Sequence, residues 1–106
     1  MNKRIKSLMS EIRTGLKNLY GPRLNGVYLY GSYARGDEDE ESDLDVLVIL
    51  EDFESYGAEV DRTSPLAASI SLEYGVSISS VFLRERDWLR GESPFLDNVR
   101  REAIAA

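Results

Sequence analysis

The segment from Asp43 to Leu50 constrains the fold of this chain more than any other part of the sequence. It begins with two aspartates around a leucine, and its remainder is wholly apolar and rich in β-branched side chains, which is typical of a β-strand. A strand without alternation of polar and apolar residues is buried on both faces of its sheet. We therefore expect a strand that begins at an exposed edge and continues into a buried sheet.

The pattern on either side of this strand predicts an α/β (α+β) fold in a single domain that spans residues 1–106. Apolar residues at helical spacing between Ile5 and Leu19 predict a first helix, which Gly21 and Pro22 end. The order that follows is strand, strand, helix, strand, helix, and it gives one sheet of at least three strands. The expected segments are strands at 26–30, 43–50 and 76–83, a helical turn at 33–36, and helices at 54–74 (broken near Pro65), at 84–90 and from 93 onward.

Composition narrows the classes of function. The chain has 13 basic and 19 acidic residues and a net charge of −6, so we expect no direct binding of nucleic acid. It has neither Cys nor His, which excludes thiolate or imidazole zinc sites and leaves oxygen ligands, the kind that suit Mg²⁺ or Mn²⁺. We find no targeting segment and no apolar run that could cross a membrane, and we expect a cytoplasmic protein.

Three local features lie between Gly31 and Asp45. Gly31 and Ser32 follow a predicted strand directly, where a small residue lets the backbone approach a phosphate and the serine hydroxyl adds a hydrogen bond. Asp43 and Asp45 are two apart on a strand, so their carboxylates lie on one face, about 7 Å apart at Cα, and could share a divalent cation. Taken alone, a Gly-Ser pair is most often a plain turn, and two aspartates at a strand end can simply face water.

The third feature is Arg35, whose guanidinium stands next to the predicted turn. It could form a forked contact with phosphate oxygens, or an ion pair with the adjacent acidic run at 37–41. The acidic run itself is read as a solvated loop.

In combination, these features form a specific motif. Gly31-Ser32, ten residues, and then Asp43-x-Asp45 resemble the signature of the nucleotidyltransferases of the DNA polymerase β superfamily, and in particular the minimal nucleotidyltransferases of bacteria and archaea. The resemblance implies a short mixed sheet flanked by helices. It implies that Gly31 and Ser32 hold the β- and γ-phosphates, and that Asp43 and Asp45 are catalytic and hold Mg²⁺ or Mn²⁺. Arg35 remains a further candidate for binding the nucleotide.

The resemblance also implies a reaction and a partner. Members of the minimal group transfer a nucleotidyl group, here AMP from ATP, to a hydroxyl of a protein such as a toxin of the HEPN type. The thin core of so short a chain fits a homo- or hetero-oligomer, in which a partner covers part of the apolar surface.

One expected part of the site is absent from the motif. Active members of the superfamily supply a third carboxylate from a neighbouring strand, and the predicted strand at 76–83 carries Ser77 and Ser79 at its polar positions instead. Glu73 and Glu85 stand before and after this strand, and we consider each as a possible substitute. The alternative function is a nucleotide-binding antitoxin subunit that lacks the third carboxylate and is catalytically weak or inactive.

Overall fold

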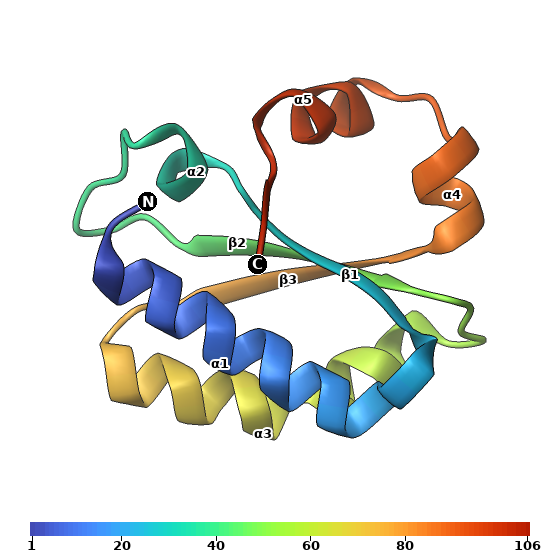
Figure 1. The fold of residues 1–106 in the computed structure, drawn as a ribbon, viewed down its shortest axis with the longest axis horizontal. Coiled ribbons are helices and arrows are strands. Elements are labelled where there is room, and N and C mark those ends of the chain that lie inside the picture. The colour runs from blue at the N-terminus through green and yellow to red at the C-terminus, as the bar shows by residue number, and fades with distance from the viewer.

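A four-stranded sheet forms the middle layer of the protein, in the strand order β3-β2-β1-β4 (Figure 1). The computed structural model describes all 106 residues. β1 runs antiparallel to β2 and β4, whereas β2 and β3 are parallel, so the sheet is mixed as expected. The elements are α1 (Lys3–Tyr20), the 3₁₀ turn η1 (Gly21–Arg23), β1 (Leu24–Tyr30), α2 (Ser32–Arg35), β2 (Leu44–Leu50), α3 (Tyr56–Tyr74), β3 (Ile78–Arg84), α4 (Glu85–Arg90), α5 (Pro94–Glu102) and β4 (Ile104–Ala105).

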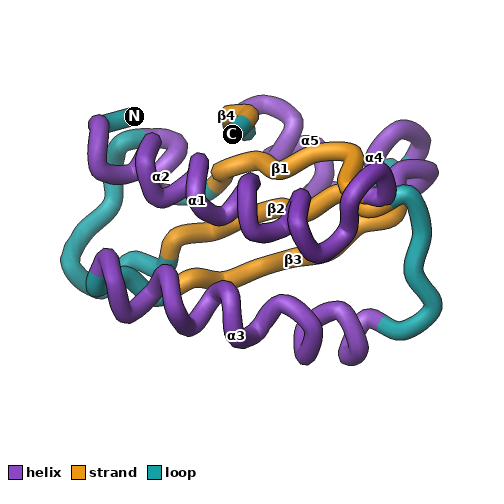
Figure 2. Tube along the Cα trace, turned by 60° about the horizontal axis from the view of Figure 1, so that its bottom comes forward, coloured by secondary structure: helices purple, strands orange, loops and turns teal.

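Helices cover both faces of this sheet, as Figures 1 and 2 show. α1 and α3 lie side by side on one face, where they form the larger core with Leu44, Val46 and other alternate residues of β2. Val99 of α5 and the half-buried Trp88 of α4 close the smaller core on the other face, together with alternate residues such as Leu47. Every residue from position 46 to 50 is at most 2% exposed, which confirms that the apolar strand is buried on both sides.

The first helix begins and ends as its sequence predicts. The Asn2 side chain accepts a hydrogen bond from the backbone N–H of Ile5 and caps the amino end of α1. Gly21, with a positive φ, ends the helix and donates its N–H to the carbonyl of Lys17. None of the helices is long and apolar enough to span a membrane.

The predicted break in the third helix near Pro65 is wrong, because α3 continues through this proline. A proline inside a helix removes one N–H donor from the ladder. Two side-chain hydroxyls form hydrogen bonds in the turn before the proline. Thr63 donates to the carbonyl of Glu59 at 3.0 Å, and Ser64 donates to the carbonyl of Val60 at 2.7 Å. Neither hydroxyl replaces the bond that Pro65 cannot donate to the carbonyl of Asp61, and the packing of α3 against α1 and the sheet keeps the helix continuous.

The strand boundaries differ slightly from those expected. β2 begins at Leu44, so that Asp43 lies just ahead of it, and β3 begins at Ile78. The expected strand start at Val76 does not hold, because the αL cap at Gly75 leaves two residues before the chain joins the sheet. The two-residue strand β4 was not predicted, because it is too short to show any alternation of polar and apolar residues.

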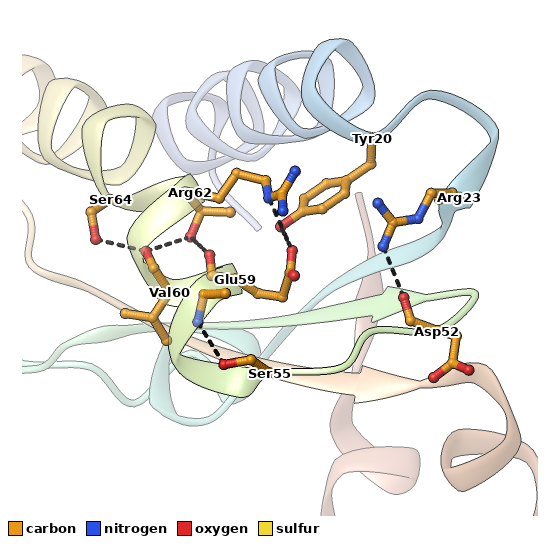
Figure 3. Close-up of polar contacts among 10 residues, drawn as sticks. Tyr20, Arg23, Asp52, Ser55, Glu59, Val60, Arg62 and Ser64 are labelled. Atoms are coloured by element: carbon orange, nitrogen blue, oxygen red, sulfur yellow. Dashed lines mark hydrogen bonds and ion pairs between the residues drawn. The ribbon is translucent and has the colours of Figure 1, made fainter.

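A buried polar pair joins α1 to α3 at the end of the sheet where β2 stops (Figure 3). The hydroxyl of Tyr20 donates to Oε1 of Glu59 at 2.7 Å, and Nε of Arg62 lies 3.3 Å from the same oxygen. Both Tyr20 and Glu59 are buried. The carboxylate is therefore stabilised by one hydrogen bond and one charged partner.

Candidate active site

The Gly-Ser turn and the second aspartate meet at one point of the sheet. Tyr30, the last residue of β1, is the register partner of Asp45 in β2. Gly31 follows with φ 77° and ψ −156°, a conformation open almost only to glycine. A methyl group on Gly31 would collide with Oδ2 of Asp45, so the carboxylate lies directly against the turn.

The two aspartates lie close enough for their charges to interact. Asp45 is half-buried at the start of β2, and Asp43 is exposed just ahead of the strand. Partial burial raises the pKa of the Asp45 carboxyl, and the negative charges of Asp43 and Glu102 raise it further, while Arg35 opposes the shift. A divalent cation at this point would remove the repulsion between the carboxylates.

Arg35 ends the short helix α2 and has two acidic partners. Its Nε donates to Asp37 at 3.2 Å, and its Nη1 donates to Glu102 at 3.0 Å. The ion pair with the acidic run, one of the two interpretations of the sequence, is thus present. Nη2 of Arg35 has no partner within the chain, so part of the guanidinium remains available to an anion.

Glu102 is a member of the site that the sequence analysis missed. Its Oε1 accepts the backbone N–H of Gly31 at 2.9 Å, while its Oε2 accepts from Arg35. It is the last residue of α5 and stands 71 positions from Gly31 in the sequence. No local pattern marks it, because its position depends on how α5 and β4 return to β1.

The two substitutes considered for the third carboxylate lie elsewhere. Glu85 accepts a hydrogen bond from the side chain of Asn25, which is near the opposite end of β1. Glu73 of α3 is exposed beside Glu11 of α1, and local desolvation and the negative charge of this neighbour raise its pKa. Neither joins the aspartate pair, so both suggestions are corrected by the structure.

The strand positions where a carboxylate was expected hold serines. Ser79 is the register partner of Asp45 in β3, and Ser77 lies just before the strand. The chain contains no ready-made cluster of three or more acidic ligands around a point. The donor set is therefore two aspartates, which fits a hard cation such as Mg²⁺ that keeps some of its water and takes other ligands from phosphate oxygens.

Ser32 completes the turn. It is the first residue of α2, and neither its backbone N–H nor its hydroxyl forms a hydrogen bond within the chain. The N–H of Gly31, by contrast, already has Glu102 as its acceptor. The groups that could meet a phosphate are thus the backbone and hydroxyl of Ser32 and the outer part of Arg35.

The protein also has an open surface pocket away from this site. It has a volume of about 480 Å³ and lies at the other end of β2, between Arg23, Asp52, Glu59 and Arg62 (Figure 3). Two of its carboxylates have partners: Asp52 pairs with Arg84, and Glu59 pairs with Arg62 and Tyr20. It lacks the Gly-Ser turn and the aspartate pair, so the chemistry indicated by the motif belongs to the opposite edge.

A mixed sheet between helices, with two aspartates beside a Gly-Ser turn at the strand edge, defines a class of enzymes that transfer phosphorus-containing groups. Residues 9–98 match the nucleotidyltransferase domain family, and the chain belongs to this family. It is 34% identical over 100 residues to MJ0141 of Methanocaldococcus jannaschii, a candidate protein adenylyltransferase, and the match covers 94% of this chain and 92% of the relative.

Solved structures show the same fold. A toxin–antitoxin complex with AMP-PNP contains a chain that superposes with a TM-score of 0.62 at 24% identity, over 89% of this chain and 68% of that one. A complex of a tri-AMPylated HEPN toxin with an MNT antitoxin from Shewanella oneidensis gives 0.52 at 21% identity, over 92% and 70% of the two chains. The expected nucleotidyltransferase fold, with its short mixed sheet, is confirmed.

Proposed function

We propose that this nucleotidyltransferase transfers AMP from ATP to a hydroxyl of a partner protein, and that the partner is a HEPN-type toxin. The observation that carries the proposal is the contact of the Asp45 carboxylate with the Gly31 turn. It brings the candidate metal ligands and the candidate phosphate-binding residues to one point. The name of the M. jannaschii relative supports a protein as the acceptor, and the toxin complexes among the structural neighbours support a HEPN partner.

Each residue of the site has a role in this proposal. Asp43 and Asp45 hold the divalent cation, Mg²⁺ or Mn²⁺, which neutralises charge on the triphosphate and lowers the pKa of an attacking hydroxyl. The hydroxyl and N–H of Ser32 and the free side of Arg35 bind phosphate oxygens. Gly31 lets the turn and Asp45 approach each other closely.

The reaction is an in-line displacement at the α-phosphorus. The acceptor oxygen forms a bond to that phosphorus, its proton passes to solvent water, and the bond from the α-phosphorus to the oxygen bridging the β-phosphate breaks. Pyrophosphate leaves and AMP remains on the acceptor. Fixed charges and donors around the phosphates contribute by stabilising the charge that develops in the transition state.

The alternative of an inactive nucleotide-binding antitoxin is not favoured. It rested on the serines of β3, which leave only two aspartates from the motif. Two aspartates are enough to hold one Mg²⁺ that takes its other ligands from water and from the phosphates. Membership of a transferase family points in the same direction.

The test uses ATP labelled at either end, incubated with Mg²⁺, this protein and a HEPN-type protein from the same genome. Label at the α-phosphate should appear on the partner, and label at the γ-phosphate should not, because pyrophosphate leaves. Replacement of both ligands, Asp43→Asn with Asp45→Asn, should lower the rate by at least about 100-fold, because the metal and its charge stabilisation are lost.

The matched control is Glu40→Gln, which removes a carboxylate from the neighbouring acidic loop. Glu40 is exposed, so this variant should retain the wild-type rate. Transfer of the γ-phosphate would instead show a kinase. Full AMP transfer by the double variant would show that the site is somewhere else.

A further inference from the structure

The carboxyl-terminal segment pairs with β1 through β4, and this pairing places the end of α5 beside the Gly-Ser turn. In β4, Ala105 pairs with Tyr28 and Ile104 with Leu29, so each step back along β4 matches one step forward along β1. The same register, extended by two residues, places Glu102 opposite Gly31. β4 thus determines which residue of the carboxyl-terminal segment reaches the site.

The hydrogen-bond pattern explains why a side chain acts there. The N–H of Ala106 donates to the carbonyl of Val27 at 2.9 Å, so this pair is of the hydrogen-bonded type. Such pairs occur at every second residue of an antiparallel ladder, and position 31 therefore also directs its N–H towards the returning chain. Glu102 is still helical at this point, and its side-chain Oε1 takes the N–H of Gly31 in place of a backbone carbonyl.

We propose that Glu102 is a positioning residue for the triphosphate: its two carboxylate oxygens hold the Gly31 peptide and the Arg35 guanidinium in the arrangement that receives the phosphates. This inference rests on the proposed function. The Ser32 N–H belongs to the next peptide, and the backbone angles of Gly31 set its direction relative to the peptide that Glu102 holds. Arg35 is held at Nη1 by Glu102 and at Nε by Asp37, which leaves Nη2 without a partner in the chain.

The geometry does not favour Glu102 as the base that removes the acceptor proton. Both of its oxygens already accept hydrogen bonds, one from a backbone amide and one from a guanidinium, and its side chain is only 20% exposed. A general base needs an oxygen within reach of the proton that it removes. A carboxylate whose two oxygens both accept hydrogen bonds instead orients its partners, as do the residues that hydrogen-bond to the ligands of a metal ion.

The test measures the affinity for Mg²⁺ with α,β-methylene-ATP, which nucleotidyl transfer cannot cleave, by calorimetric titration. Glu102→Gln keeps an oxygen for the Gly31 N–H but presents an amide donor to Arg35, and it should weaken binding about tenfold. In an Arg35→Ala background the same change should weaken binding less than twofold, because its target is gone. Glu92→Gln, on the exposed segment before α5, is the matched control and should bind as the wild type does.

A readout without nucleotide separates this inference from the proposed function. In a ¹H–¹⁵N spectrum, Glu102→Ala should move the Gly31 amide resonance, whereas Glu92→Gln should leave it in place. Tighter nucleotide binding by Glu102→Gln would show that the carboxylate competes with phosphate, and unchanged binding would show that it plays no part. Either result overturns the inference while the wild type still transfers AMP. A wild type that binds no Mg²⁺–nucleotide overturns the proposed function and the inference together.

Discussion

Two structural features of position 31 exclude any residue with a side chain. Its backbone angles lie in a region that only glycine enters at low cost, and its Cα lies against the carboxylate of Asp45. Gly31→Ala should therefore lower the free energy of unfolding by about 1–3 kcal/mol from the strained backbone, with a further loss from displacement of Asp45. Urea unfolding measures the first effect, and titration with Mg²⁺–nucleotide measures the second.

Gly36 provides the matched control. It also has a positive φ, of 80°, but no atom lies within 4 Å of the position that its Cβ would take. Gly36→Ala should cost about 1–2 kcal/mol for the left-handed backbone alone and should leave Asp45 in place. If both variants lost nucleotide binding equally, the contact between Gly31 and Asp45 would not explain the requirement for glycine.

The buried hydroxyl of Tyr20 predicts a loss of stability in alkali. Burial, followed by its hydrogen bond to Glu59, raises the pKa of this hydroxyl above the ordinary 10.0, and burial also raises the pKa of Tyr30, to about 12. Above pH 10 the unfolded chain releases protons that the folded chain retains, so the free energy of unfolding should fall as the pH rises. Below pH 10 both states keep the protons, and this contribution is fully present.

Tyr20→Phe isolates the effect. At neutral pH this variant should lose about 1.5–3 kcal/mol, because Glu59 loses a hydrogen bond to a buried carboxylate. Between pH 10 and 12 its free energy of unfolding should fall less steeply than that of the wild type. Urea unfolding at a series of pH values tests this, and equal slopes for the two proteins would contradict it.

At the scale of elements, the sequence predicts what depends on local periodicity. The apolar run of β2, the amphipathic α1 and the Gly-Ser turn all have local signals, and the structure has each of them. Pro65 does not break α3, because tertiary packing outweighs the missing N–H, and packing cannot be read from a local pattern. Glu102 has no local sequence signal. It reaches Gly31, 71 positions away in the sequence, only because the two residues of β4 pair with β1.

The role of β4 can be tested with two prolines. The N–H of Ala106 donates to Val27, so Ala106→Pro removes this bond and should lower the free energy of unfolding by about 0.5–1.5 kcal/mol. It should also weaken nucleotide binding, because Glu102 loses its anchored position. The N–H of Ala105 points away from the sheet, because β4 is an edge strand and Ala105 is not in a hydrogen-bonded pair. Proline is tolerated at such a position, so Ala105→Pro should retain nucleotide binding. Equal effects of the two prolines would contradict this role.

At the scale of the whole molecule, the fold gathers negative charge around a site for a negatively charged ligand. The chain has a net charge of −6, and Asp43, Asp45 and Glu102 surround the turn, with Arg35 as the cation among them. A triphosphate adds further negative charge. ATP binding should therefore depend on a divalent cation that bridges the carboxylates and the phosphates.

Ligand-dependent stability tests this requirement in the intact protein. A ligand that binds only the folded state, at 100 times its dissociation constant, stabilises it by about 2.7 kcal/mol. For a domain of this size, each kcal/mol raises the melting temperature by about 4–8 °C, so Mg²⁺ with ATP should give a shift on the order of 10–20 °C. ATP in EDTA should give almost none, because the repulsion between the carboxylates and the triphosphate remains. An equal shift in EDTA would mean that the aspartate pair does not act through a metal.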